Sequence, residues 1–269
     1  MSLLDHDSQH DPNRILPIDY DWAREYYEQG VANNWTPAEV PMADDVHQWR
    51  NDELTPEERQ LVEWNLGFFS TAESLTANNI VLAVYDHVTA PECRQYLLRQ
   101  AYEEAIHTDT FIYCCDSLGF DPDYLYGMYD RIPAIEAKDE FVVDLTRTVD
   151  REDFTIDDDA DRRAFLRDLI GFYVIMEGIF FYAGFAMMLA LKRRGKMVGV
   201  GEQFEYIMRD ESLHLNFGVD LVNGIREEHP GVWTEDFEAE IADLIREAVD
   251  LEAVYAREAC PEAVLGMSS

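Results

Sequence analysis

The amino-acid sequence predicts an all-α protein that folds as a helix bundle. Helix start and stop signals recur along the whole chain, and alternating strand-like patterns are scarce. A third observation is the apolar segment 169–191, LIGFYVIMEGIFFYAGFAMMLAL, which contains one charged residue, Glu177. The length of 269 residues suffices for one large domain or two small ones, and the hydrophobic content of 47% allows a sizeable core.

Helix start and stop signals in the sequence give the expected positions of the helices. Residues 55–58, TPEE, supply an N-cap, a proline at the first helical position and a capping-box glutamate. Gly119 and Gly195 follow long helical patterns and should end them. The sequence predicts a loop over 151–162 and helices over 56–88, 91–119, a short segment from 122 to 132, 134–149, 161–194, 199–228 and 235–258.

The apolar segment 169–191 is long enough to span a membrane. A carboxylate at the bilayer centre is costly, however, and both flanks are basic, so they give no orientation bias. A helix that is apolar all round is also typical of the middle of a large bundle. We therefore expect a buried core helix and no membrane span. In either setting Glu177 needs a cation or a proton.

The chain is strongly acidic, with 55 acidic and 21 basic residues and a formal net charge of -34. It would repel phosphate, so we expect no nucleic-acid partner. Such an excess of one charge also destabilises the compact state at low salt. The acid is spread along the chain and is either an ordinary solvated surface or an adaptation to molar salt, where screening is short-ranged. We favour a halophilic source.

The chain starts without the basic and apolar stretches of a signal peptide. The cysteines form no CxxC or zinc-like spacing; they are Cys93, Cys114, Cys115 and Cys260. Both observations favour a reducing, cytoplasmic location. We expect a flexible N-terminal segment over 1–17, a single helical domain over 18–258 and a truncated C-terminal segment over 259–269.

Two Glu-x-x-His motifs are the strongest chemical signal, EAIH at 104–107 and ESLH at 211–214. Residues three apart share one face of a helix, so each pair can bind one ion. Two such motifs are not unusual in number for a chain this acidic, and their placement matters more. Both lie among apolar residues of predicted helices. Two further predicted helices each carry a lone acid in apolar surroundings, Glu73 and Glu177.

Four helices would thus supply Glu, Glu-x-x-His, Glu and Glu-x-x-His, the ligand set of di-iron and di-manganese carboxylate bundles. The predicted metal ligands are Glu73, Glu104, His107, Glu177, Glu211 and His214. Four carboxylates balance two divalent ions, and carboxylates with imidazoles suit iron and manganese. The alternative is a set of four unrelated surface acids and two core histidines.

The context of these residues resembles the small, radical-generating subunit of class I ribonucleotide reductase. The similar segments are RDESLHLNFG around Glu211, EGIFFYAGFA from Glu177, FFSTAESLTANN around Glu73 and NNWTPAEVPM around Trp35. The resemblance covers about residues 18–268. It implies a ferritin-like helix bundle with a di-metal carboxylate site in its core.

The resemblance also implies a chemistry and partners. The metal pair would react with O2 and become a strong oxidant. The oxidising equivalent would pass to a separate large catalytic subunit, where nucleotide reduction starts. Trp35, Asp210 and His107 match the family's relay between the protein surface and the metals. Taken alone, Trp35 could be a core aromatic residue and Asp210 a surface acid. A homodimer is expected from the family.

Two positions depart from the family's usual pattern. Phe111 stands four residues after His107, where the family usually has its radical tyrosine, and it cannot form a stable phenoxyl radical. Glu73 stands where aspartate is common. Together they resemble subclass Ic, which stores its oxidant on a manganese–iron pair. We therefore expect one Mn and one Fe, with di-iron as the alternative. Tyr206 matches a position that assists electron delivery in that subclass, and Tyr113 is a second redox candidate, although packing explains both equally well.

Other interpretations remain open. The chain stops at VLGMSS, whereas the family continues with a tail that docks the large subunit, so this chain alone should assemble metals without supporting nucleotide reduction.

A ligand-binding oxidase of the same superfamily would carry a tyrosine five residues before Glu177. This chain has Phe172 there, and Tyr173 is one residue off. A ferritin-like metal-binding protein would need neither Trp35 nor the relay.

Overall fold

The computed structural model describes residues 2–4, 14–75, 81–149, 151 and 153–260. Within these ranges the chain is helical and contains no strand. The helices are α1 Asp21–Ala32, α2 Ala43–Arg50, α3 Pro56–Leu75, α4 Val81–His87, α5 Pro91–Leu118, α6 Pro122–Tyr126, α7 Met128–Arg131, α8 Pro133–Leu145, α9 Asp159–Leu169, a π-helical segment Ile170–Phe180, α10 Tyr182–Arg193, α11 Val198–Glu228 and α12 Glu235–Ala259. The predicted all-α class is confirmed.

Local capping explains where several helices begin and end. The Thr55 hydroxyl accepts from the Glu58 N–H at 3.2 Å, and the Glu58 carboxylate accepts from the Thr55 N–H at 3.0 Å. This is the reciprocal capping box that the sequence predicts before α3. Gly119 ends α5 with a φ of +80°, a left-handed conformation that glycine adopts without a steric penalty.

Some predicted boundaries are wrong. Helix α9 begins at Asp159, inside the expected loop, because the Asp158 carboxylate accepts from the N–H groups of Ala160 and Asp161. The helix expected over 134–149 ends at Leu145. Helices α1 and α2 were not predicted. Part of the expected helix 56–88 falls on residues 76–80, which lie outside the described residues.

The helix expected over 161–194 is not a regular α-helix. Its middle, Ile170–Phe180, is π-helical, and the α-helical path resumes at Tyr182. π-helical insertions place extra residues on a helix face and occur frequently at functional sites. The insertion contains Glu177. It also brings Gly171 so close to α8 that an added Cβ would lie 2.8 Å from the Leu145 Cβ.

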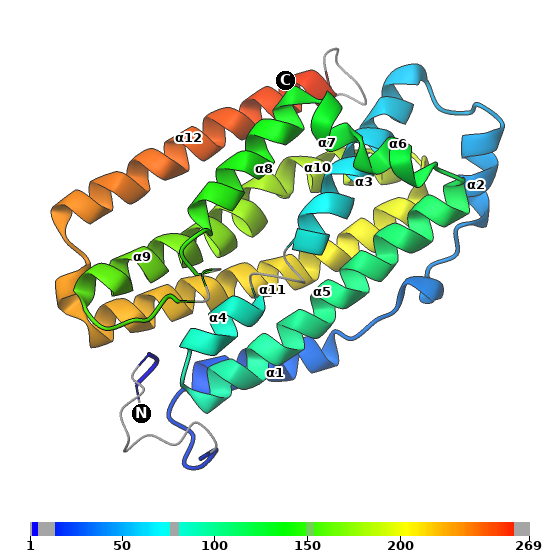
Figure 1. Cartoon of the computed structure of the whole chain (residues 1–269). Helices are drawn as coiled ribbons and strands as arrows, with labels where there is room; N and C mark the ends of the chain where they lie inside the picture. Colours follow the sequence, from blue (N-terminus) through cyan, green and yellow to red (C-terminus); the bar gives the residue numbers. More distant parts are fainter. Residues whose placement is uncertain (1, 5–13, 76–80, 150, 152, 261–269) are drawn as a thin grey trace.

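The long helices α5 and α11 run side by side through the middle of the bundle (Figure 1). Helices α3 and α10 and the π-helical segment pack around them, and α12 lies along α8. An aromatic cluster fills the space between α3, α5, α10 and α11; it consists of Phe69, Phe111, Phe181, Phe185 and Phe204. The core therefore lies where the four predicted ligand helices meet.

The apolar segment is a core helix of this bundle. By length and hydropathy, Asp159–Arg193 is the one described helix that could cross a membrane, and 56% of its most apolar stretch is buried within the fold. Phe172 and Ile175 are fully buried, and so is Glu177. The expectation of a buried core helix is confirmed.

The terminal segments are described in part. Leu3 and Leu4 are buried, and the Leu3 carbonyl accepts from the Thr89 N–H at 2.8 Å. Residues 5–13 and 261–269 lie outside the described residues, so the domain limits expected from the sequence stay predictions.

Candidate metal centre

Four helical segments bring the six predicted ligands to one point. All six side chains are fully buried. They come from α3 (Glu73), α5 (Glu104 and His107), the π-helical segment (Glu177) and α11 (Glu211 and His214). The two Glu-x-x-His motifs face each other, and the rings of the two histidines lie 5.9 Å apart. The structure therefore forms a buried carboxylate–histidine cluster in the core.

The cluster has two halves that share two carboxylates. In the first, the His107 half, Nδ1 of His107 lies 3.0 Å from Glu211 Oε1, 3.4 Å from Glu73 Oε2 and 3.5 Å from Glu104 Oε2. One ligand atom from each of these four residues lies within 4.8 Å of the others. This grouping can hold one metal ion.

The second, the His214 half, uses the other oxygens of the shared carboxylates. Nδ1 of His214 lies 3.1 Å from Glu104 Oε1, 3.3 Å from Glu211 Oε2 and 3.8 Å from Glu177 Oε1. Glu104 and Glu211 thus direct one oxygen to each half. Carboxylates that offer one oxygen to each of two ions are the natural bridges of a two-metal site.

The inward-facing atoms fit a pair of cations. Within the described part of the chain, the side-chain oxygens of Glu73, Glu104 and Glu211 make no hydrogen bond, although they lie close to the histidine Nδ1 atoms. Buried charged groups require a partner. Two divalent ions would satisfy all of these atoms and balance four carboxylates, so the donor set fits a di-metal carboxylate site.

The electrostatics of the cluster's own side chains indicate the same need for cations. Burial raises the pKa of Glu73 and Glu177 well above the usual range of a glutamate. The neighbouring Glu211 charge adds to the effect at both residues. Burial alone would lower the pKa of His107, but Glu73 and Asp210 raise it well above normal. Without metals, the cluster therefore holds protons that bound cations would replace.

The predicted relay residues lie beside the His107 half. Nε2 of His107 is 3.4 Å from Asp210 Oδ2, and the Trp35 indole N–H donates to the same oxygen at 2.7 Å. Trp35 is 3% exposed, and its ring centroid is 6.5 Å from that of His107. A carboxylate behind a metal-ligating histidine fixes the orientation of its ring.

The other redox candidates lie in different places. Phe111 is buried and stacks on Phe69 with ring centroids 5.7 Å apart. The Tyr206 ring lies 5.1 Å from the Trp35 ring, and its hydroxyl donates to Glu202. Tyr113 donates to the Val40 carbonyl at 3.3 Å. The structure thus brings Tyr206 to the relay, and Tyr113 contacts the loop that follows Trp35.

Sequence reasoning missed a second layer around the cluster. Glu103 accepts from Nε2 of His214 at 2.9 Å, and Gln100 donates to Glu177 at 3.2 Å. Tyr173, which is fully buried, donates to Gln100 at 3.0 Å. The sequence contains a pattern that could have indicated this second layer. Polar residues recur at spacings of four, three and four on one face of α5: Tyr96, Gln100, Glu103 and His107.

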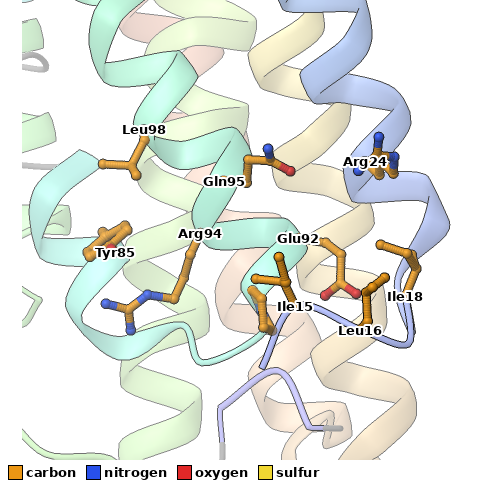
Figure 2. A pocket seen from close by; sticks show the side chains of 10 residues that line it. Ile15, Leu16, Ile18, Arg24, Tyr85, Glu92, Arg94, Gln95 and Leu98 are labelled. Atoms are coloured by element: carbon orange, nitrogen blue, oxygen red, sulfur yellow. The ribbon is translucent and has the colours of Figure 1, made fainter. Parts of the chain in front are cut away.

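Two cavities open near α5. One of about 470 Å³ lies at the start of the helix, where Ile15, Leu16 and Ile18 gather around the Glu92 carboxylate (Figure 2). No residue of the metal cluster lines it. The second, of about 190 Å³, lies between α3, α5 and α6 and is lined by Phe111. It is therefore the cavity next to the aromatic cluster around the metal centre.

Comparisons with known proteins agree with this geometry. The profile of the family described as ribonucleotide reductase, small chain, matches residues 12–269. The ribonucleoside-diphosphate reductase subunit beta of Chlamydia pneumoniae is 53% identical over 97% of this chain and 76% of its own length. The small chain of Neurospora crassa is 30% identical over 95% of this chain and 58% of its own length.

A solved structure extends the likeness to the fold. The ribonucleotide reductase R2 subunit from Clostridium botulinum matches with a TM-score of 0.88 and 26% identity, over 100% of this chain and 81% of that one. The chain spans about three quarters of its bacterial relative and less than two thirds of the fungal one. The chain belongs to the ribonucleotide reductase small-chain family, whose members include the beta subunits of ribonucleoside-diphosphate reductase.

Proposed function

We propose that this chain is the radical-initiating small subunit of a ribonucleoside-diphosphate reductase of subclass Ic. The observation that carries the proposal is the buried cluster in which two carboxylates each direct one oxygen to both halves. Its proposed metal ligands are the six residues predicted from the sequence. When bound, one manganese and one iron ion, or two iron ions, would supply electrons to O2 and would then hold the oxidising equivalent.

Phe111 supports the manganese–iron assignment. It is 2% exposed, stacks on Phe69 and meets Phe204 edge-on at 5.7 Å. These rings exclude water from one side of the cluster. Phe111 has no phenolic hydrogen to lose, so this position cannot hold the oxidising equivalent as a tyrosyl radical. Iron and manganese both suit the donor set, and the choice between them follows from Phe111 and Glu73 through the resemblance to subclass Ic.

The oxidising equivalent would reach the large catalytic subunit through Trp35, Asp210 and His107. Asp210 accepts from the Trp35 N–H and faces Nε2 of His107, so one carboxylate joins the indole to a metal ligand. The Tyr206 ring extends this contact away from the cluster. These contacts favour the reductase over a ligand-binding oxidase or a ferritin-like store, neither of which needs such a path.

Metal analysis and electron paramagnetic resonance (EPR) spectroscopy test the proposal. Protein loaded with Mn2+ and Fe2+ and exposed to O2 should retain two metals per chain and show a coupled manganese–iron signal. A tyrosyl radical signal in the natural chain would contradict it, and so would the absence of bound metal.

We also propose a homodimer. Three large apolar side chains on one face of α5 are about half exposed: Leu98, Tyr102 and Ile112. They lie on one side of the helix, with the exposed Asp109 between Tyr102 and Ile112, and exposed apolar side chains of this size suit an interface with a second copy. Light scattering should give twice the mass of the chain, and Ile112→Glu should shift the protein towards the monomer. A natural protein that is monomeric at micromolar concentration would overturn this assignment.

The net charge of -34 leads us to propose a cytoplasmic protein adapted to high salt. Screening of like charges should then stabilise the fold. The midpoint of thermal unfolding should rise by several degrees between 0.05 M and 2 M KCl. A chain that is equally stable at both concentrations would contradict the halophilic interpretation.

A further inference from the structure

A series of hydrogen-bonded side chains leads outward from His214; we call this series the His214 arm. The outward nitrogen of His214, Nε2, lies 2.9 Å from Glu103 Oε2. The other oxygen of Glu103 accepts from Arg99 Nε at 3.0 Å, and the Arg99 guanidinium also donates to the Asn34 side chain at 3.0 Å. Glu103 is fully buried, and both of its oxygens are bonded.

The His107 half has an arm of the same design. Nε2 of His107 faces Asp210, and the Arg209 guanidinium donates to the other oxygen of Asp210 at 3.2 Å. Arg209 also donates to the backbone carbonyl of Asn33. Each half therefore runs from histidine to carboxylate to arginine, and the two arms end on adjacent residues, Asn33 and Asn34. These residues follow α1 and directly precede Trp35.

Helix α1 packs tightly over the His214 arm. A Cβ added to Gly30 would lie 2.9 Å from Glu103 Oε1 and 3.1 Å from Arg99 Cγ. A larger residue at this position would require the Glu103 carboxylate or the Arg99 side chain to shift. The carboxylate is thus held by Arg99 from its own helix and covered by a second helix, which leaves it few alternative positions.

We propose that Glu103 is a positioning residue for His214, the counterpart of Asp210 for His107, and that Arg99 and Gly30 hold it in place. Glu103 accepts the Nε2 hydrogen of His214, so Nδ1 is left free to bind a metal ion. Loss of such an outer carboxylate typically weakens metal binding about 10- to 100-fold. This inference rests on the proposed metal ligands and assigns each outer carboxylate to one half of the cluster.

The test is a titration of metal-free protein with Mn2+, followed through the EPR signal of the free ion. The natural chain should bind two ions. Glu103→Gln keeps the size of the side chain and removes its charge, and it should weaken one ion by about 10- to 100-fold. Asp210→Asn should weaken the other ion. Crystals of each variant with one equivalent of Mn2+ should place the ion in the His107 half for Glu103→Gln and in the His214 half for Asp210→Asn.

Glu28→Gln is the matched surface control, because Glu28 pairs with Arg24 on the exposed side of α1. This variant should bind both ions as the natural chain does. If Glu103→Gln does not fold, Arg99→Gln should weaken the same ion. The inference is wrong if these variants leave both ions unchanged or weaken both equally. A natural chain that binds no Mn2+ would instead contradict the proposed metal ligands.

Discussion

Trp35 and Asp210 form the direct link between the N-terminal loop and the metal centre. The indole N–H donates to Asp210 Oδ2 at 2.7 Å, and the same oxygen faces Nε2 of His107 at 3.4 Å. The two residues are 175 positions apart in the chain, and both are almost fully buried. This contact connects α11 to the loop after α1 and joins an oxidisable side chain, through one carboxylate, to a proposed metal ligand.

Replacing Trp35 with phenylalanine tests this route. Trp35→Phe keeps an aromatic ring but removes the N–H that binds Asp210. We expect two bound metals and a normal reaction with O2, because none of the proposed ligands changes. Nucleotide reduction in the complete enzyme should fall to background. Metal analysis with an activity assay checks this, and a variant with more than about half the natural turnover would exclude Trp35 from the path.

Phe111→Tyr tests where the oxidising equivalent resides. Phe111 lines a cavity of about 190 Å³, and we expect the variant to fold with a loss of no more than about 3 kcal/mol. After exposure to O2, the variant alone should show a tyrosyl radical by EPR. Phe111→Leu is the control and should show none. A tyrosyl signal of equal size in the natural chain would mean that another tyrosine holds the radical.

Substitution of Lys138 tests how the π-helical segment is held in the fold. Its ammonium is fully buried, donates to the Phe180 carbonyl at 2.9 Å and lies 2.6 Å from a Glu252 oxygen. Lys138→Met leaves Glu252 without its cation and should destabilise the fold by about 3 kcal/mol. The double variant Lys138→Met/Glu252→Leu should recover most of this loss. Urea unfolding of the three proteins measures it, and a single variant as stable as the natural chain would contradict the role of the pair.

The buried carboxyl of Asp139 should make the stability of the fold depend on pH. Burial raises the pKa of its carboxyl from 3.8 to about 7, and Lys138 opposes this only in part. Between these values the folded state binds more protons than the unfolded state, so the stability contributed by the protonated carboxyl is lost as pH rises towards 7. Asp139→Asn does not titrate. It should match the natural chain near pH 4 and exceed its stability by up to about 4 kcal/mol at pH 8.

Urea unfolding of both proteins at pH 4 and pH 8 checks the direction of this difference in stability. A variant that is less stable than the natural chain at pH 8 would show that the Asp139 carboxylate is stabilised in the fold, contrary to its burial. Glu140→Gln serves as the control, because Glu140 is exposed on the same helix.

The sequence predicted the inner cluster because its signal is local. Helical spacing identifies two Glu-x-x-His pairs, Glu104 with His107 and Glu211 with His214. Two lone acids in apolar helices complete the set, Glu73 and Glu177. Capping signals likewise placed the boundary at Gly119. These predictions needed no knowledge of which helices touch.

The outer layer depends on contacts between helices and was not predictable in this way. Glu103 is adjacent to Glu104, but its partner His214 lies 111 positions away. The pairing of Lys138 with Glu252 joins α8 to α12 across a similar distance. The π-helical path of Ile170–Phe180 also escaped prediction, because its apolar residues fit an α-helix equally well and the change in register follows from packing.

The most direct test of the metal centre is a crystal structure of metal-loaded protein with anomalous difference maps measured at the iron and manganese edges. We expect two peaks between α3, α5, α11 and the π-helical segment. One should lie among Glu73, Glu104, His107 and Glu211, the other among Glu104, Glu177, Glu211 and His214, with iron in one half and manganese in the other. Peaks at any other place in the fold, or no peak at this cluster, would contradict the proposed function.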